Sequence, residues 1–214
     1  MPEARSTVFL LDDDEAVVVA LGRVLRASGY SVSPWTSAAE FLVAHDPGIP
    51  GCLVADVRMP TMSGLALQHA LAARGIERPI VFITAQADIP TTVQAMKAGA
   101  VTFLPKPVQR LELLTAVAEA IARDASQRVQ HQERLEVSRR LASLTPRELQ
   151  VLDLVATGLL NKQIAAELGA AEKTIKVHRS RIMQKINVRT ATALVGLLSR
   201  TAARPSSASA LRAP

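Results

Sequence analysis

The chain has 214 residues, a formal net charge of +6, 49% hydrophobic residues and a single cysteine. This length suits two domains, because single cores commonly stop growing near roughly 100–200 residues. No apolar run reaches the roughly 18 residues of a membrane span, and the first residues lack the pattern of a signal peptide, which predicts a cytoplasmic protein without a membrane partner. Cys52 has no second cysteine for a disulfide or a zinc site, so we expect it to pack as a small hydrophobe.

Charge is spread unevenly along the chain. Residues 1–106 carry 8 Lys and Arg against 10 Asp and Glu, whereas residues 107–214 carry 17 against 9, so the two halves have net charges of −2 and +8. Such asymmetry is typical of an acidic regulatory domain joined to a basic domain that binds nucleic acid.

Residues 1–122 alternate short apolar runs with stretches of helical periodicity. The runs predict buried strands and the stretches predict helices, which gives five βα units and a doubly wound parallel sheet, the α/β class. The strands are expected at Val8–Leu11, Tyr30–Pro34, Leu53–Ala55, Ile80–Thr84 and Val101–Leu104, and the helices at Glu15–Ala27, Ala38–Ala44, Gly64–Arg74, Thr91–Ala98 and Val108–Arg123. In such sheets the chemistry gathers at the carboxyl ends of the strands.

Polar side chains follow the predicted strands at that edge. They are Asp12, Asp13 and Asp14 after the first strand, Asp56 after the third, Thr84 at the end of the fourth and Lys106 after the fifth. One carboxylate of such a group can accept a phosphoryl group while others hold a hard cation such as Mg²⁺. An acidic run also caps helices, and capping is the expected role of Asp14, which precedes a predicted helix.

The segments VFLLDDDEAV, CLVADVRMPTMSG, VFITAQADI and AGAVTFLPKP, in this order, resemble a CheY-like receiver domain over residues 5–123. The resemblance implies that Asp56 is the phosphorylated residue and that Asp12 and Asp13 form the acidic pair. It also implies that Mg²⁺ is bound by Asp13, Asp56 and the backbone carbonyl of Arg58.

The same resemblance implies a switch. Thr84 and Lys106 are expected to contact the phosphoryl group, and the Lys106–Pro107 peptide bond is expected to be cis. Phe103 matches the aromatic switch position, although a plain core phenylalanine is the alternative. Phosphorylation is then expected to favour dimers through the face formed by Thr91–Leu104.

Two other classes of protein fit parts of the pattern. Asp12-Asp13-Asp14 superficially suits the Asp-x-Asp-x-Thr/Val start of a haloacid dehalogenase type enzyme, but Ala16 occupies the Thr/Val place. A small-molecule sensor, as in quorum-sensing regulators, would need an apolar ligand cavity in place of the carboxylates. The sequence therefore favours a regulator that is not an enzyme.

Residues 123–143 are rich in Gln, Arg and Glu and are expected to form a linker, with a helix continuous with the preceding one as an option. The next domain is expected at residues 144–200, and its pattern is helical from Leu144 to Leu198, with Thr145 as an N-cap before Pro146 and breaks at Gly158 and Gly169. Residues 201–214 have too little to bury and are expected to be a disordered tail.

Two short helices with a turn between them, Asn161–Leu168 and Glu172–Ile186, have the spacing of a helix-turn-helix. The segment LTPRELQVLDLVATGLLNKQIAAELGAAEKTIKVHRSRIMQKINV resembles the four-helix C-terminal domain of NarL/FixJ (LuxR-type) regulators, and both halves together are most similar to the FixJ-like arrangement. Ile175, Ile182 and Ile186 share one face of the second helix and are expected to dock on an all-α core.

The opposite face of that helix carries Lys173, Val177, Ser180 and Gln184, flanked by Lys176 and Arg181. Residues 171–190 hold six Lys or Arg and one acidic residue, enough to neutralise several phosphates. By resemblance, Lys176, Val177 and Ser180 face base edges, whereas Lys173, Thr174, Arg179 and Arg181 contact phosphates. His178 is expected to pack inward, and Ala171 stands where the family usually has a capping serine, a loss that typically costs about 0.5–2 kcal/mol.

Together the two halves predict a two-component response regulator that controls transcription. Its expected partners are a sensor histidine kinase, double-stranded promoter DNA, a second copy of itself when phosphorylated and, as a further candidate, RNA polymerase. Its expected cofactor is Mg²⁺.

Overall fold

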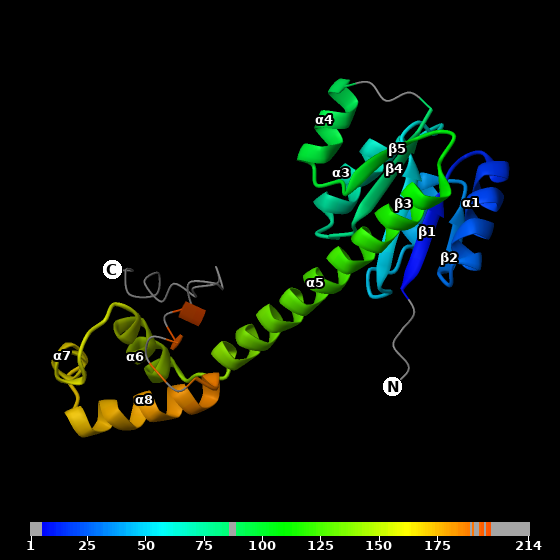
Figure 1. Ribbon diagram of the computed structural model, residues 1–214. Helices are drawn as coiled ribbons and strands as arrows, with labels where there is room; N and C mark the ends of the chain where they lie inside the picture. The colour runs from blue at the N-terminus through cyan, green and yellow to red at the C-terminus, as the bar shows by residue number, and fades with distance from the viewer. Residues whose placement is uncertain (1–5, 86–88, 189, 191–192, 195, 198–214) are drawn as a thin grey trace. The chain divides into compact units, whose positions relative to one another are not determined.

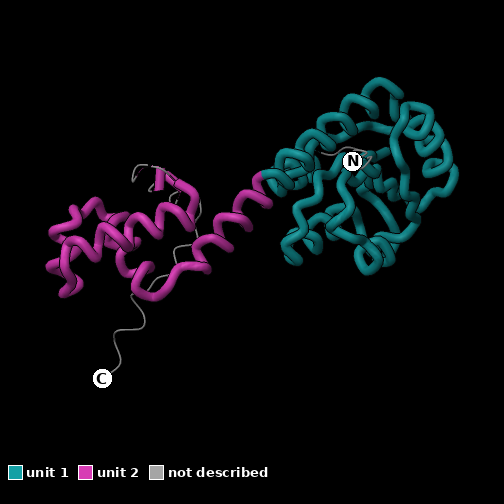
Figure 2. Tube along the Cα trace, turned by 90° about the horizontal axis from the view of Figure 1, so that it is seen from below, with its two compact units in different colours: residues 1–129 teal, residues 130–214 magenta. Residues whose placement is uncertain are grey.

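The computed structural model describes residues 6–85, 89–188, 190, 193–194 and 196–197. The chain separates into two compact units, residues 1–129 and 130–214, coloured teal and magenta in Figure 2. Within the described ranges, no helix combines the length and the apolar character needed to cross a membrane.

The first unit contains a five-stranded parallel sheet in the order β2-β1-β3-β4-β5 (Figure 1). The strands are β1 Thr7–Leu11, β2 Ser31–Trp35, β3 Gly51–Asp56, β4 Ile80–Thr84 and β5 Thr102–Pro105. The predicted α/β sheet is confirmed, with strand limits displaced by up to two residues. Because the chain reverses its direction of winding between β1 and β3, polar residues after these two strands meet at the crevice of the sheet.

Helices cover both faces of the sheet, since successive residues of a strand point to opposite sides. In β1, Val8 and Leu10 belong to a core shared with α1 (Glu15–Ala27) and the first part of α5. Phe9 and Leu11 belong to the other core, shared with α2 (Ala38–Ala44), α3 (Gly64–Ala73) and α4 (Ile89–Lys97). Cys52 is fully buried in the first core, as predicted.

Helix α5 runs from Arg110 to Ala142, a length of 33 residues. The sequence predicts a helix from Val108 to Arg123, with a helical linker continuous with it as an option. The structure has the continuous helix. Residues 123–142 contain no glycine or proline, so no residue in this stretch interrupts the backbone hydrogen bonds.

The second unit contains α6 (Pro146–Ala156), α7 (Asn161–Glu167) and α8 (Glu172–Ile186). The predicted cap is confirmed, because Thr145 accepts from the Glu148 N–H while Glu148 accepts from the Thr145 N–H, with Pro146 in the first turn. Gly158 and Gly169 have φ of 87° and 59° and end α6 and α7, since glycine takes this left-handed conformation without strain. The expected fourth helix lies mostly, and the tail 201–214 wholly, outside the described residues.

Candidate functional site

Five polar residues converge at the carboxyl edge of the sheet in the first unit. Asp12 and Asp13 follow β1, Asp56 ends β3, Thr84 ends β4 and Lys106 follows β5. Asp12, Asp56 and Thr84 are 0%, 7% and 1% exposed, whereas Asp13 is exposed. The sequence prediction that these residues share one site is therefore matched by their positions in the fold.

Lys106 joins the two buried carboxylates of this pocket. Its Nζ donates to Asp12 Oδ2 at 2.7 Å and to Asp56 Oδ2 at 2.8 Å. The Arg58 backbone N–H donates to the other oxygen of Asp56 at 3.1 Å, and the Asp14 N–H donates to Asp12 Oδ1 at 3.0 Å. These bonds hold the carboxylates in fixed orientations.

The pKa values of Asp12 and Lys106 are both raised, Asp12 by burial and Lys106 by its hydrogen bonds to carboxylates. Burial raises the pKa of Asp12, and this outweighs the lowering by the Lys106 ammonium and the Asp14 N–H. Burial alone would lower the pKa of Lys106, but hydrogen bonds from Lys106 to Asp12 and Asp56 raise it overall. Lys106 is therefore fully protonated at neutral pH and can interact with an anionic group at this edge.

Carboxylate oxygens of Asp12, Asp13 and Asp56 lie within 4.8 Å of one another. Hard divalent cations such as Mg²⁺ take oxygen ligands of this kind, so the donor set fits the predicted metal. The exposed Asp13 leaves the group open to solvent on one side. Asp14 lies outside the group and caps α1 by accepting from the Ala16 N–H at 2.8 Å, as predicted.

The predicted switch residues flank the pocket. The Thr84 carbonyl accepts from the Lys106 N–H at 2.8 Å, which joins the end of β4 to the lysine. Phe103 in β5 is half-buried, and its ring centroid lies 5.1 Å from that of Phe82. The Lys106–Pro107 peptide bond is cis, which confirms the prediction.

The second unit presents a basic helix face. Ile175, Ile182 and Ile186 of α8 are 0%, 1% and 1% exposed, so the predicted inward face is confirmed. The exposed residues of α8 include those that were predicted to contact DNA: Lys173, Thr174, Lys176, Val177, Ser180 and Arg181. Val177 is 44% exposed, so its methyl groups are accessible on this side of the helix.

Arg179 differs from the other predicted contact residues. It is half-buried, and its Nη1 donates to Asn161 Oδ1 of α7 at 2.8 Å, so the side chain ties α8 to α7. The role of Asn161 could not be predicted from the sequence, because a lone asparagine at a helix start carries no signal for a partner 18 residues away.

An ion pair between α6 and α8 was also missed. Lys185 Nζ donates to Glu148 Oε2 at 2.7 Å, and Glu148 is 3% exposed. The Thr-x-x-Glu spacing from Thr145 is a capping-box signature that could have identified Glu148. The Lys185 ammonium, followed by the Thr145 N–H, lowers the pKa of Glu148 to about 2.

The start of α8 has no side-chain cap. Ala171 occupies the N-cap position and makes no capping hydrogen bond through its side chain, which follows from the departure noted in the sequence. His178 is half-buried, and its Nδ1 is buried without a hydrogen-bond partner among the described residues.

Comparison with protein families agrees with this two-part organisation. The family described as "Response regulator receiver domain" matches residues 8–118, and that described as "Bacterial regulatory proteins, luxR family" matches residues 142–198. The chain is 44% identical to Nodulation protein W of Bradyrhizobium diazoefficiens over 89% of this chain and 84% of that protein. It is 43% identical to the transcriptional regulatory protein FixJ of Azorhizobium caulinodans over 91% of this chain and 92% of that protein.

A solved structure supports the same assignment. The response regulator StyR is 49% identical, aligns over 92% of this chain and 100% of its own, and has a TM-score of 0.81. The chain therefore belongs to the NarL/FixJ family of response regulators. It is a transcription regulator with a receiver domain and a LuxR-type DNA-binding domain, which sets aside the dehalogenase and small-molecule-sensor alternatives.

Proposed function

We propose that this response regulator is switched by transfer of a phosphoryl group from the phosphohistidine of a sensor kinase to Asp56. The observation that carries the proposal is the convergence of Asp12, Asp13, Asp56 and Lys106 at one edge of the sheet, with Lys106 Nζ 2.7 and 2.8 Å from two carboxylates. A cation already paired with Asp56 can pair with the phosphoryl group that replaces the carboxylate charge.

In this transfer a carboxylate oxygen of Asp56 attacks phosphorus, the P–N bond of the phosphohistidine breaks, and the imidazole of the kinase leaves. Asp13, Asp56 and the Arg58 carbonyl would hold Mg²⁺, which when bound supplies positive charge against the phosphoryl oxygens. Lys106 and the Thr84 hydroxyl contact the remaining oxygens. Asp12 keeps Lys106 directed into the pocket.

Phosphorylation then favours a dimer through the face of α4 and β5, residues 91–104. Thr84 and Phe103 connect the pocket to this face, and phosphorylation need only favour one of two existing conformations to shift the population. Helix α4 exposes Ile89, Val93 and Met96 by 79%, 45% and 44%, which supports an apolar contact there. Two joined copies engage two DNA half-sites and gain from the raised effective concentration.

At the DNA, α8 enters the major groove. Lys176, Val177 and Ser180 face base edges, whereas Lys173, Thr174 and Arg181 contact phosphates. Arg179, which the sequence also predicted as a phosphate contact, is instead held by Asn161 of α7. We assign residues 1–122 to the receiver, 123–143 to the linker, 144–200 to the DNA-binding domain and 201–214 to a tail. The protein acts in the cytoplasm, on promoter DNA, with RNA polymerase as a further partner.

Incubation with acetyl phosphate and Mg²⁺ tests the pocket. Intact mass should show one added phosphoryl group, and Asp13→Ala should bind Mg²⁺ far more weakly than Asp14→Ala, its exposed neighbour outside the carboxylate group. Equal losses of Mg²⁺ affinity in the two variants would contradict the ligand assignment.

Sizing and DNA titration test the switch. Phosphorylated protein should elute as a dimer and bind a two-half-site duplex more tightly than unmodified protein at the same salt concentration. If both forms are monomers with equal affinity, the proposed switch is wrong.

A further inference from the structure

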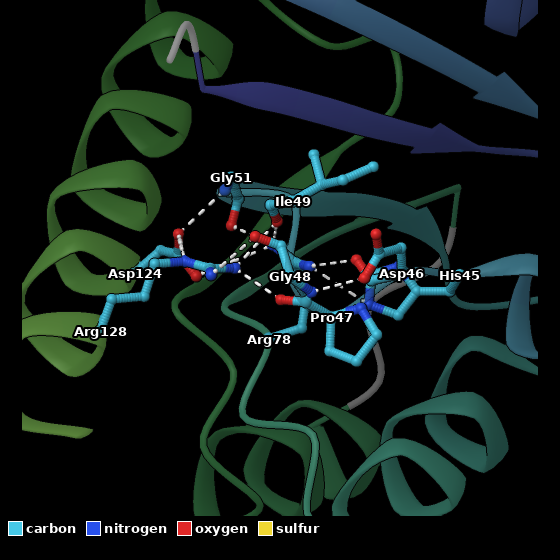
Figure 3. Close-up of polar contacts among 9 residues, drawn as sticks. All are labelled: His45, Asp46, Pro47, Gly48, Ile49, Gly51, Arg78, Asp124 and Arg128. Atoms are coloured by element: carbon cyan, nitrogen blue, oxygen red, sulfur yellow. Dashed lines mark hydrogen bonds and ion pairs between the residues drawn. The ribbon is translucent and has the colours of Figure 1, made fainter. Parts of the chain in front are cut away.

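A cluster of charges, buried at Arg78 and Asp124 and half-buried at Arg128, joins α5 to the start of β3 (Figure 3). It lies at the opposite end of β3 from Asp56. We call Arg78, Asp124 and Arg128 the α5 clamp. Asp124 Oδ2 accepts from the Gly51 N–H at 2.9 Å and from Arg128 Nε at 2.7 Å. Its other oxygen lies 3.7 Å from Arg78 Nη1, and the Arg78 and Asp124 side chains are 1% and 6% exposed.

The two arginines of the α5 clamp bind the backbone of the segment that leads into β3. Arg128 donates through Nη1 and Nη2 to the carbonyls of Gly48, Pro47 and Ile49 at 3.1, 2.8 and 2.8 Å. Arg78 Nη1 donates to the carbonyls of Ile49 and Gly51 at 2.9 and 3.0 Å. Figure 3 shows Asp124 and Arg128 extending from α5 toward this segment.

Arg78 also holds the beginning of the segment. Its Nη2 lies 3.2 Å from His45 Nε2 and donates to the Asp46 carbonyl at 3.3 Å. Burial and the neighbouring Arg78 charge lower the pKa of His45 to about 4. The ring is therefore neutral at pH 7 and Nε2 accepts the hydrogen bond, because a guanidinium can only donate.

The strands that start at the α5 clamp end at the phosphorylation pocket. Gly51 is the first residue of β3 and Asp56 is the last, while Arg78 precedes the first residue of β4 by two positions and Thr84 is the last. On the other side, Asp124 and Arg128 belong to α5, which continues to Ala142. Buried ion pairs add little net stability compared with apolar packing of the same volume, and removal of one partner leaves an uncompensated buried charge.

We propose that Asp124 and Arg128 are positioning residues that pass the phosphorylation signal from β3 and β4 to α5, and along α5 to the DNA-binding unit. The proposal rests on the proposed function, because phosphorylation of Asp56 must raise DNA affinity. The route differs from the α4 and β5 face in its residues, since Asp124 and Arg128 belong to α5 and contact the segment that leads into β3. If phosphorylation favours one of two positions of β3 and β4, the contacts of the α5 clamp shift α5 to the matching position.

Arg128→Ala in the full chain is the variant that tests this route. The change removes the contacts of α5 to residues 47–49, while the buried Asp124 keeps Arg78 and the Gly51 N–H. Arg123→Ala, an exposed arginine of the same helix outside the α5 clamp, is the matched control. The DNA is a duplex selected from a random-sequence pool by the wild-type protein treated with acetyl phosphate and Mg²⁺.

We expect phosphorylation to raise the affinity of the wild type and of Arg123→Ala for this duplex by similar factors. In Arg128→Ala that gain should fall by at least about fivefold, the lower end of typical coupling between sites. The rate of phosphoryl incorporation and the DNA affinity of the unphosphorylated protein should not change. A variant that was merely misfolded would lower one or both. Hydrogen exchange of residues 129–142 should respond to phosphorylation in the wild type and not in Arg128→Ala.

A full gain in Arg128→Ala overturns the inference and leaves the proposed function intact. No gain in the wild type overturns the proposed function itself, and the inference with it. If Arg128→Ala does not incorporate phosphate, Arg128→Lys carries the same test, because lysine keeps the charge beside Asp124 and loses the forked contacts to three carbonyls.

Discussion

The two units build their functional surfaces in different ways. In the receiver, Asp12, Asp56 and Lys106 come from the ends of three strands, and the sheet brings Lys106 Nζ to within 2.7 and 2.8 Å of the two carboxylates. In the DNA-binding unit, the exposed Lys173, Lys176 and Arg181 all belong to one helix, α8, and their exposure follows from the helical spacing of its buried isoleucines. Substitution of one residue of the receiver pocket should therefore abolish its chemistry. Substitution of one charged residue of α8 should remove only part of the DNA-binding free energy.

Asp56→Asn should have the largest effect, because it removes the attacking carboxylate of the convergent site. Intact mass should show no phosphoryl group added by acetyl phosphate. The variant should bind DNA as the unphosphorylated wild type does, because the DNA-binding unit is unchanged. Asp14→Asn, which alters an exposed capping residue next to the pocket, should still incorporate one phosphoryl group. Persistent labelling of Asp56→Asn would place the phosphorylated residue elsewhere.

Glu148→Ala should separate the stability of the two units. The variant loses the capping box and the ion pair with Lys185, which keeps only its bond to the Ser143 carbonyl, so we expect the second unit to lose about 2 kcal/mol of unfolding free energy. Urea unfolding followed by circular dichroism should shift, while the fluorescence of Trp35, the single tryptophan, should report an unchanged receiver. Glu136→Ala, which breaks an exposed pair with Arg140, should cost less than about 0.5 kcal/mol.

Acid should weaken the second unit through the same carboxylate. The folded-state pKa of Glu148 is lowered from 4.5 to about 2, so its contribution is present above pH 4.5 and is lost as the pH falls toward 2. Asp12 has a raised pKa and the opposite sign, since its contribution is present at low pH and is lost as the pH rises through the folded pKa. Between pH 5 and pH 3 the urea midpoint measured by circular dichroism should fall, and Glu148→Gln should flatten that fall.

Arg181→Ala should produce a moderate and graded effect, because Arg181 is one of several charges on the α8 face. We expect weaker binding to all duplexes and a salt-dependence slope reduced by about 1. Lys176→Ala should instead change the sequence preference in a selection from random duplexes. The reverse pattern would exchange the roles of the two residues.

Ala171→Ser should give the smallest effect, a gain of about 0.5–1 kcal/mol, because it supplies the missing side-chain cap of α8. Thermal unfolding of the second unit by circular dichroism measures it. Ala166→Ser, at an exposed position within α7, has no free N–H to cap and should give no gain. Equal changes in both variants would show that serine acts there through something other than capping.

Sequence patterns predicted the elements well where periodicity and punctuation were strong. The five βα units, the cap at Thr145 and the buried face of Ile175, Ile182 and Ile186 follow from spacing and local chemistry. The end of α5 could not be read from the sequence, because a polar stretch without glycine or proline is compatible with both a loop and a helix. The choice depends on the packing of the rest of the chain.

By itself, the sequence determined which residues can carry charge, metal or phosphate and which face of α8 is polar, because side-chain chemistry and helical period are local properties. Tertiary structure decided that Lys106 bridges Asp12 and Asp56, that Arg179 is held by Asn161 and that Asp124 joins α5 to β3. These contacts join residues 18 to 94 positions apart. Their distances depend on how whole strands and helices pack, which no local pattern encodes.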